Sequence, residues 1–194
     1  MNATTSSANK ASGLGKWLFE NRDYTPIPLI LLLAFISKAN ALSATLGLLV
    51  ILCGEAIRIY SVAFIGTVSR TRSTSLGENL ITSGPFFWVR NPLYLANFLI
   101  VTGVGIFSAK IWFVLVVTLL FFVQYFPIIQ YEEQLLEERF GDEYRSYRAR
   151  TPMWWPNKLP NPEQLESPTT ILPALQSEKR TITAIAAVIL LMLL

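Results

Sequence analysis

Two short stretches of this sequence carry most of the side chains that could do chemistry. The first is an arginine, an asparagine and a proline at positions 90–92, followed by Tyr94. The second is a pair of adjacent glutamates, Glu132 and Glu133. Paired carboxylates repel one another unless a cation or a ligand rich in hydroxyl groups lies nearby. That cation could be an arginine of the chain or a sulfonium, so the pair is a candidate binding site, and the alternative is a solvated helix face.

The composition excludes several other kinds of chemistry. The 194 residues include no histidine and a single cysteine, Cys53. Disulfides within the chain, Cys/His zinc sites and catalytic triads that need imidazole are therefore excluded, and no metal is expected. The formal net charge is +3, but the basic residues are scattered among apolar runs. We expect anionic lipid headgroups, and no nucleic acid, as the partners of this charge.

The hydropathy indicates a membrane protein. Hydrophobic residues make up 52% of the chain and charged residues only 15%, against about 25% charged residues in a soluble domain. The first and last of the five apolar segments, 24–37 and 181–194, have 14 residues each, which is short for a hydrocarbon core of about 30 Å. We predict an all-α polytopic membrane bundle of about five helices, whose last segment either crosses the membrane or lies in its plane. The apolar segments are 24–37, 41–65, 93–109, 111–129 and 181–194.

The distribution of lysine and arginine predicts the orientation of this bundle. Segments 1–23, 66–92 and 130–180 hold three, three and seven of these residues, whereas the two tight turns hold only Lys38 and Lys110. Because basic residues favour the cytoplasmic side, the three segments are predicted to lie there, and a site built from them would open on the cytoplasmic face.

The sequence divides into four predicted regions. A polar N-terminal tail (1–23) precedes a transmembrane helical hairpin (24–65), and residues 66–156 hold a loop, a second hairpin and an amphipathic helix. Residues 157–194 form a proline-rich segment and a C-terminal apolar helix. The fourth apolar helix is expected to continue through the amphipathic stretch 130–150. Six prolines between positions 151 and 173 predict irregular structure there.

Two features inside the apolar segments have structural and functional interpretations. Arg58 follows Glu55 by three residues in the second segment, so the pair either lines a site or takes part in an interhelical ion pair that fixes packing. Gly103 and Gly105 lie in the third segment, where no strand precedes them as a dinucleotide loop would require. We predict that they allow close packing of helices.

The order of three motifs resembles a known family. The sequence reads LITSGPF at 80–86 and RNPLY at 90–94, and after a helical hairpin two glutamates lead through Phe140-Gly141 to Tyr144 and Tyr147. This set is similar to the isoprenylcysteine carboxyl methyltransferases and the related membrane phospholipid methyltransferases. The resemblance covers about residues 66–156. It implies a polytopic helical fold and S-adenosylmethionine as the cofactor, bound on the cytoplasmic face.

The resemblance also implies roles for individual residues. Glu132 would accept hydrogen bonds from the cofactor, and the backbone at the start of the third apolar helix would hold its polar groups. Arg90, Tyr94 and Glu133 are the candidate catalytic residues, and Arg70 and Arg72 are candidates for contact with the substrate. The implied cofactor-binding residues are Leu80, Ile81, Phe86, Asn91, Pro92, Leu93, Tyr94 and Glu132.

Two positions depart from the family pattern. Asn91 stands where the family has histidine, which keeps a hydrogen-bonding side chain but removes a titrating group. Ile128 stands where the isoprenylcysteine enzymes carry an arginine that contacts the substrate carboxylate. Arg70, Arg72 or Arg90 could supply a replacement positive charge.

The expected activity is methyl transfer from S-adenosylmethionine to a lipid-like carboxylate or thiol, from a lipophilic or prenylated substrate delivered by the bilayer. Such acceptors need little acid or base catalysis, so alignment and exclusion of water would supply most of the rate. One alternative is N-methylation of a phospholipid headgroup, for which Glu133 or Tyr94 would have to remove a proton. The other is a non-catalytic membrane protein.

Overall fold

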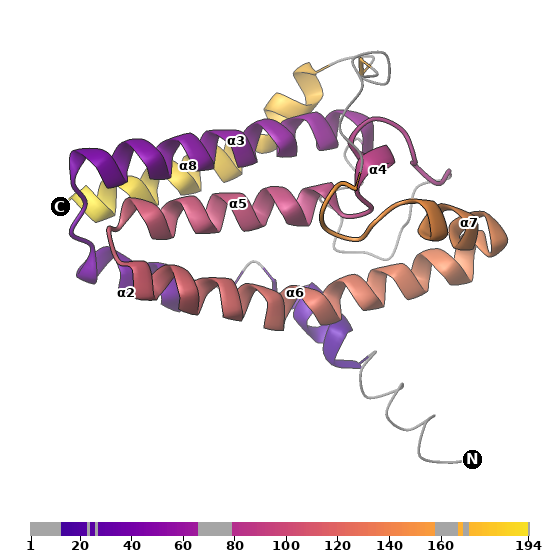
Figure 1. Ribbon diagram of the computed structural model, residues 1–194, viewed down its shortest axis with the longest axis horizontal. Coiled ribbons are helices and arrows are strands. Elements are labelled where there is room, and N and C mark those ends of the chain that lie inside the picture. Colours follow the sequence, from indigo (N-terminus) through magenta and orange to yellow (C-terminus); the bar gives the residue numbers. More distant parts are fainter. Residues whose placement is uncertain are drawn as a thin grey trace.

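The computed structural model describes residues 13–22, 24–25, 27–65, 79–157, 167–168 and 171–193, and within these parts every regular element is a helix (Figure 1). This agrees with the predicted all-α fold. Residues 13–21 are helical, and the labelled helices follow them. They are α2 (Ile27–Ile36), α3 (Ala41–Ile65), α4 (Pro85–Trp88), α5 (Pro92–Phe107), α6 (Ile111–Phe140), α7 (Asp142–Arg150) and α8 (Leu172–Leu193).

Helices α3 and α5 run antiparallel and form the closest packing in the bundle (Figure 1). A Cβ atom on Gly103 would lie 2.7 Å from Cγ1 of Ile51 and 2.8 Å from the carbonyl oxygen of Gly47. The two backbones can approach this closely only because both positions are glycine. A Cβ atom on Gly105 would lie 3.1 Å from Val114 of α6. The prediction that Gly103 and Gly105 allow close packing of helices is confirmed.

The two tight turns lie together at one end of the bundle. The backbone N–H of Lys38, between α2 and α3, donates a hydrogen bond of 3.1 Å to the carbonyl oxygen of Ser108, between α5 and α6. Helices α4 and α7 lie at the opposite end (Figure 1). The two turns, which hold only Lys38 and Lys110, therefore lie at the opposite end of the bundle from α7, which carries Arg145, Arg148 and Arg150. The orientation of the bundle in the membrane stays a prediction.

Among the helices that the structure describes, two are long and apolar enough to cross a membrane. They are α3, with 25 residues, and α6, with 30 residues. Only 28% and 22% of their most apolar windows are buried, so most of their apolar side chains face outward, unlike those of a core helix in a soluble protein. Helix α5 is apolar but has 16 residues. That all five apolar segments cross the membrane stays a prediction.

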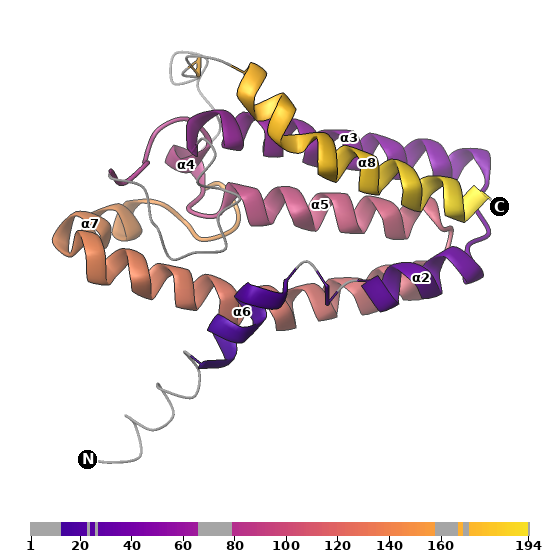
Figure 2. The ribbon, with the colours of Figure 1, turned by 180° about the vertical axis from the view of Figure 1, so that it is seen from behind.

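The C-terminal helix is longer than the apolar segment that predicts it. Helix α8 begins at Leu172 and has Pro173 in its first turn, where proline is tolerated because the N–H it lacks would have no partner in the helix. The predicted irregular segment 151–173 is therefore wrong at its last two residues. Helix α8 packs along α3 and also contacts α2, on the outside of the bundle (Figure 2).

The amphipathic stretch after the fourth apolar segment also differs in detail. Helix α6 continues to Phe140, as expected, but Gly141 then adopts a φ of 53°, and the chain turns into the separate helix α7. Glycine accepts this left-handed conformation without strain, which explains the break. Helix α7 therefore lies beside the end of α6 instead of extending it (Figure 1).

Candidate functional site

The start of α5 is shaped by a compact turn. Gly84 adopts a φ of 56° and is the N-cap of α4, and a Cβ atom there would lie 2.5 Å from the ring of Phe64 in α3. Val89 is extended, and Pro92 is the first residue of α5. Proline suits this position because its fixed φ is already helical. The turn therefore places Arg90 and Asn91 immediately before the first turn of α5.

Arg90 connects three parts of the chain. Its Nε donates a hydrogen bond of 2.8 Å to Oε1 of Glu133 in α6. Its Nη1 donates to the carbonyl oxygens of Thr151, at 2.6 Å, and Arg148, at 3.1 Å. Both side chains of the ion pair are buried, with 9% of the Arg90 side chain and 7% of the Glu133 side chain exposed. The guanidinium is thus held by acceptors of the protein itself.

Tyr94 contacts the other glutamate of the pair. Its hydroxyl donates a hydrogen bond of 2.7 Å to Oε2 of Glu132. Its ring lies 5.1 Å from that of Tyr125, which precedes Glu132 on α6 by seven residues, about two turns. Phe19 and Ile128 are buried in the same cluster. The two stretches that the sequence singles out therefore meet by direct contact, Arg90 with Glu133 and Tyr94 with Glu132.

The segment that follows α7 returns to the start of α5. The backbone N–H of Arg90 donates to the carbonyl oxygen of Pro152 at 2.9 Å, and Nδ2 of Asn91 donates to that of Met153 at 3.4 Å. The ring of Trp154 then lies 5.4 Å from that of Phe122 in α6. Residues 151–154 therefore pack against both α5 and α6 beside the glutamate pair.

Tyr147 bonds α7 to α4, and Tyr144 is buried beside it. The Tyr147 hydroxyl donates a hydrogen bond of 2.7 Å to the carbonyl oxygen of Phe86 in α4. Burial raises the pKa of Tyr147, and the neighbouring Tyr144 adds to the effect. Burial also raises the pKa of Tyr144, and the negative charge of Glu133 raises it further. Both hydroxyls are therefore neutral at physiological pH, and that of Tyr147 is a hydrogen-bond donor.

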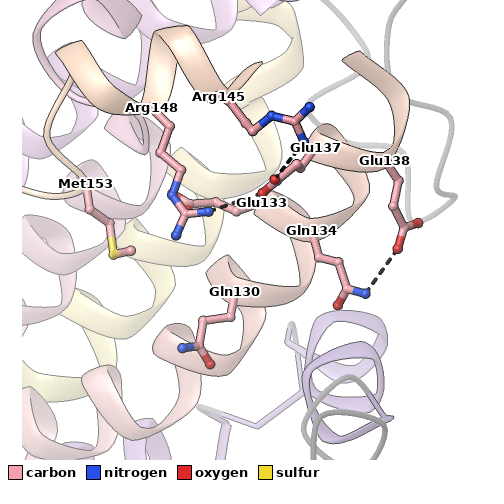
Figure 3. A pocket seen from close by; sticks show the side chains of 8 residues that line it. All are labelled: Gln130, Glu133, Gln134, Glu137, Glu138, Arg145, Arg148 and Met153. Atoms are coloured by element: carbon pink, nitrogen blue, oxygen red, sulfur yellow. Dashed lines mark hydrogen bonds and ion pairs between the residues drawn. The ribbon is translucent and has the colours of Figure 1, made fainter. Parts of the chain in front are cut away.

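An open groove of about 510 Å³ lies beside this junction, between α6 and α7 (Figure 3). Arg145 and Arg148 of α7 point towards Glu137 of α6 and form ion pairs of 3.4 and 3.2 Å with it. Glu137 is half-buried. The lining residues are Gln130, Glu133, Gln134, Glu137, Glu138, Arg145, Arg148 and Met153.

The structure describes most of the residues that the sequence proposes for the site. Arg90, Asn91, Tyr94, Glu132 and Glu133 come together, and Glu133 also lines the groove. The other described residues of the prediction do not line the groove: Phe86 and Pro92 are buried, and Leu80, Ile81 and Leu93 are half-buried. The proposed substrate residues Arg70 and Arg72 lie outside the described residues.

Sequence reasoning missed one basic residue of the site. Arg22 lies near enough to Tyr94 and Glu132 to interact electrostatically with both, and its guanidinium carbon is 4.2 Å from the ring centre of Phe19. Phe19 and Arg22 belong to segment 1–23, which was expected to be a polar tail. Residues 13–21 of that segment are helical instead. The apolar run Trp17-Leu18-Phe19 was the available signal.

Comparison with known proteins places this arrangement in a family. The chain is 31% identical over 117 residues to the nickel-cobalt-cadmium resistance protein NccN of Alcaligenes xylosoxydans xylosoxydans and to the cobalt-zinc-cadmium resistance protein CzcN of Cupriavidus metallidurans. The aligned part is 60% of this chain and 51% and 50% of the two relatives, so the chain spans about half the length of the curated relatives it matches. The model of the phospholipid methyltransferase family matches residues 42–143, which is more than half of the chain. The chain belongs to the phospholipid methyltransferase family.

Proposed function

We propose that the protein is an integral-membrane methyltransferase that uses S-adenosylmethionine and acts on a lipid-like carboxylate or thiol at the cytoplasmic face. Family membership supports the reaction class. The observation that carries the assignment of the site is the double contact at the start of α5, where Tyr94 bonds Glu132 at 2.7 Å and Arg90 bonds Glu133 at 2.8 Å. The two motifs would thus form one site.

The residues at this junction fit the proposed cofactor. A sulfonium is a cation, and cations are stabilised by carboxylates and by the faces of aromatic rings. Glu132 is half-buried and is oriented by the hydroxyl of Tyr94, whose ring lies beside that of Tyr125. The adjoining groove, of about 510 Å³, lies within the range of roughly 300 to 1,000 Å³ for small-molecule sites.

The chain's own residues would orient and enclose the reactants. When bound, S-adenosylmethionine supplies a methyl group that is already activated. Tyr94 would keep Glu132 in place, and the buried pair of Arg90 and Glu133 would fix the start of α5 against α6. Holding reactants in line at near-attack distance can supply roughly 7 to 11 kcal/mol of the barrier. Arg90 and Glu133 are thus proposed as positioning residues, and Tyr94 and Glu132 as residues that contact the cofactor.

The class of methyl acceptor is proposed from the scarcity of side chains at the site that could remove a proton. A carboxylate or a thiolate can accept a methyl group without losing a proton, whereas an ammonium headgroup must first be deprotonated. The chain has no histidine, and Glu133 is engaged by Arg90. A carboxylate, or a thiol that reacts as its thiolate, therefore suits these residues better than the amine of a phospholipid headgroup.

Methyl labelling tests the proposal and separates it from its alternatives. Membranes that contain the protein are incubated with S-adenosylmethionine carrying a radioactive methyl group, and the labelled lipids are treated with base. We expect a base-labile product from a carboxylate acceptor or a thioether from a thiol. Label in a base-stable amine headgroup would instead establish N-methylation. Membranes with no label above those of the Glu132→Ala variant would contradict the enzyme assignment and favour a non-catalytic protein.

A further inference from the structure

A second charged cluster lies inside the helix bundle. Nε of Arg58 in α3 donates a hydrogen bond of 2.7 Å to Oε2 of Glu178 in α8, and Nη1 of Arg58 donates to Oδ1 of Asn97 in α5. The side chain of Glu178 is fully buried and 16% of the Arg58 side chain is exposed. Of the two interpretations of Arg58 drawn from the sequence, the interhelical ion pair is present, with Glu178 as the partner.

The energetics of this pair favour more than a packing role. A buried ion pair is often no more stabilising than apolar side chains of similar volume, because both charges lose their hydration. Ionisable groups at membrane depth are rare and usually mark a substrate or ion site. Apolar residues at these positions would hold α8 against α3 equally well. The charged cluster is therefore expected to have a binding role.

The cluster lies next to the proposed site. Asn97 follows Tyr94 by three residues on α5, a rise of roughly 4.5 Å along the helix axis. Tyr94 contacts Glu132 of α6, whereas Asn97 contacts Arg58 of α3. The guanidinium of Arg58 thus lies about one turn further along α5 than the residues proposed to hold the methyl donor.

Arg58 is better placed than Arg90 to receive an acid group from a lipid. Arg90 is held by Glu133 and two backbone carbonyl groups at the end of the bundle. Arg58 lies within the apolar helix α3 and is covered by α8, which packs on the outside of α3 (Figure 2). A displacement of α8 would therefore expose Arg58 and Asn97 to the lipid phase.

We infer that Arg58 and Asn97 bind the acid head group of an apolar acceptor, and that the carboxylate of Glu178 occupies this position until the acceptor replaces it. The inference rests on the proposed function, and it narrows the acceptor to an apolar chain with one acid group, either a carboxylate or a phosphate. An arginine can accept either group through its several N–H donors. In this arrangement Glu178 acts as an internal competitor.

Competition binding in phosphatidylcholine nanodiscs tests this inference. The full-length protein is titrated with dodecanoate, dodecyl phosphate and dodecanol, and each competes with the fluorescent fatty acid cis-parinarate. We expect the wild type to prefer an acid over the alcohol, and the stronger of the two acids to identify the acceptor head group. Arg58→Gln should remove the preference. Glu178→Gln should tighten acid binding roughly tenfold or more, because Arg58 then lacks its internal carboxylate.

The opposite signs of these two effects distinguish binding from packing. If Arg58→Gln and Glu178→Gln weaken acid binding equally, or if neither changes it, the inference is overturned. Arg150→Gln is the matched control, since Arg150 is an exposed arginine of α7 that donates to the carbonyl oxygen of Ser146. A loss of preference in this control as large as in Arg58→Gln would also overturn the inference.

A double variant covers the case in which a single change prevents folding. Arg58→Gln/Glu178→Gln removes both charges of this ion pair together and should fold, but it should bind acid and alcohol equally. A retained preference for acids would overturn the inference. Titration of the wild type with S-adenosylmethionine in the same nanodiscs tests the proposed function separately, because it does not depend on the preference for acids.

Discussion

Arg90 and Glu133 lie 43 residues apart in the sequence and form a buried ion pair of 2.8 Å. This contact joins the turn before α5 to the end of α6, so two stretches that lie far apart in the sequence become one structural unit. Because each charge is satisfied by the other, neither is presented to a substrate as a free group. The pair therefore sets the distance between α5 and α6 on which the neighbouring contact of Tyr94 with Glu132 depends.

Removal of one member of this pair should destabilise the fold. We expect Arg90→Gln to lower the free energy of unfolding by about 3–5 kcal/mol, because it leaves the buried carboxylate of Glu133 with only a longer ion pair of 3.8 Å to Arg148. Thermal unfolding in detergent, followed by circular dichroism, measures the effect. The double variant Arg90→Gln/Glu133→Gln should recover much of the loss, and a double variant no more stable than the single one would disprove the ion-pair explanation.

The bond between Tyr94 and Glu132 should matter for the cofactor more than for the fold. Tyr94→Phe keeps the ring beside Tyr125 but removes the donor, and we expect it to weaken S-adenosylmethionine binding roughly tenfold. Calorimetry with Tyr94→Phe, Glu132→Gln and the double variant measures the coupling. Independent, additive losses would show that the two side chains do not act as a unit.

The sequence predicts much of the site because its key residues lie within local patterns. Pro92 marks the start of a helix, and the glutamate pair follows an apolar segment of membrane length, so both could be placed without tertiary information. The ring contact of Trp154 with Phe122 and the position of Arg22 near Tyr94 and Glu132 could not be predicted. Both depend on how segments without a repeating pattern fold back onto the bundle.

The same limit applies to Arg58 and α8. The sequence shows that Arg58 needs a partner, and Glu55 is the near candidate along the helix. The structure shows the partner Glu178, which lies 120 residues away on a helix that packs against α3. The sequence does not predict the start of α8, because Pro173 and the polar residues before Thr181 resemble the irregular segment that precedes them. Tertiary packing, not local preference, decides where such a helix begins.

Because α3 and α5 pack closely, a methyl group added at Gly103 should lower the stability of the fold strongly. Gly103→Ala would place Cβ 2.8 Å from backbone atoms of Gly47 and Ile51, which cannot move without separating the helices. We expect a loss of about 1–3 kcal/mol of stability. Gly105→Ala is the control, because its Cβ would meet only Val114, at 3.1 Å. Equal unfolding temperatures for the two variants would contradict this packing.

The two buried tyrosines of α7 predict a loss of stability at high pH. Folding raises the pKa of Tyr144 and Tyr147 above the ordinary value of about 10, so the unfolded chain releases these protons first as the pH rises. Their contribution is fully present below that pH and declines above it. Unfolding temperatures measured between about pH 9 and 11.5 should fall less steeply in Tyr144→Phe/Tyr147→Phe than in the wild type. Parallel curves would exclude these tyrosines as the cause.

Calorimetric titration of the detergent-solubilised full-length protein with S-adenosylmethionine tests the central claim most directly. We expect the wild type and Glu143→Ala, which alters an exposed acidic residue of α7, to bind with equal affinity, and Glu132→Ala to show no binding. Failure of the folded wild type to bind would contradict the account, and so would equal binding by all three proteins.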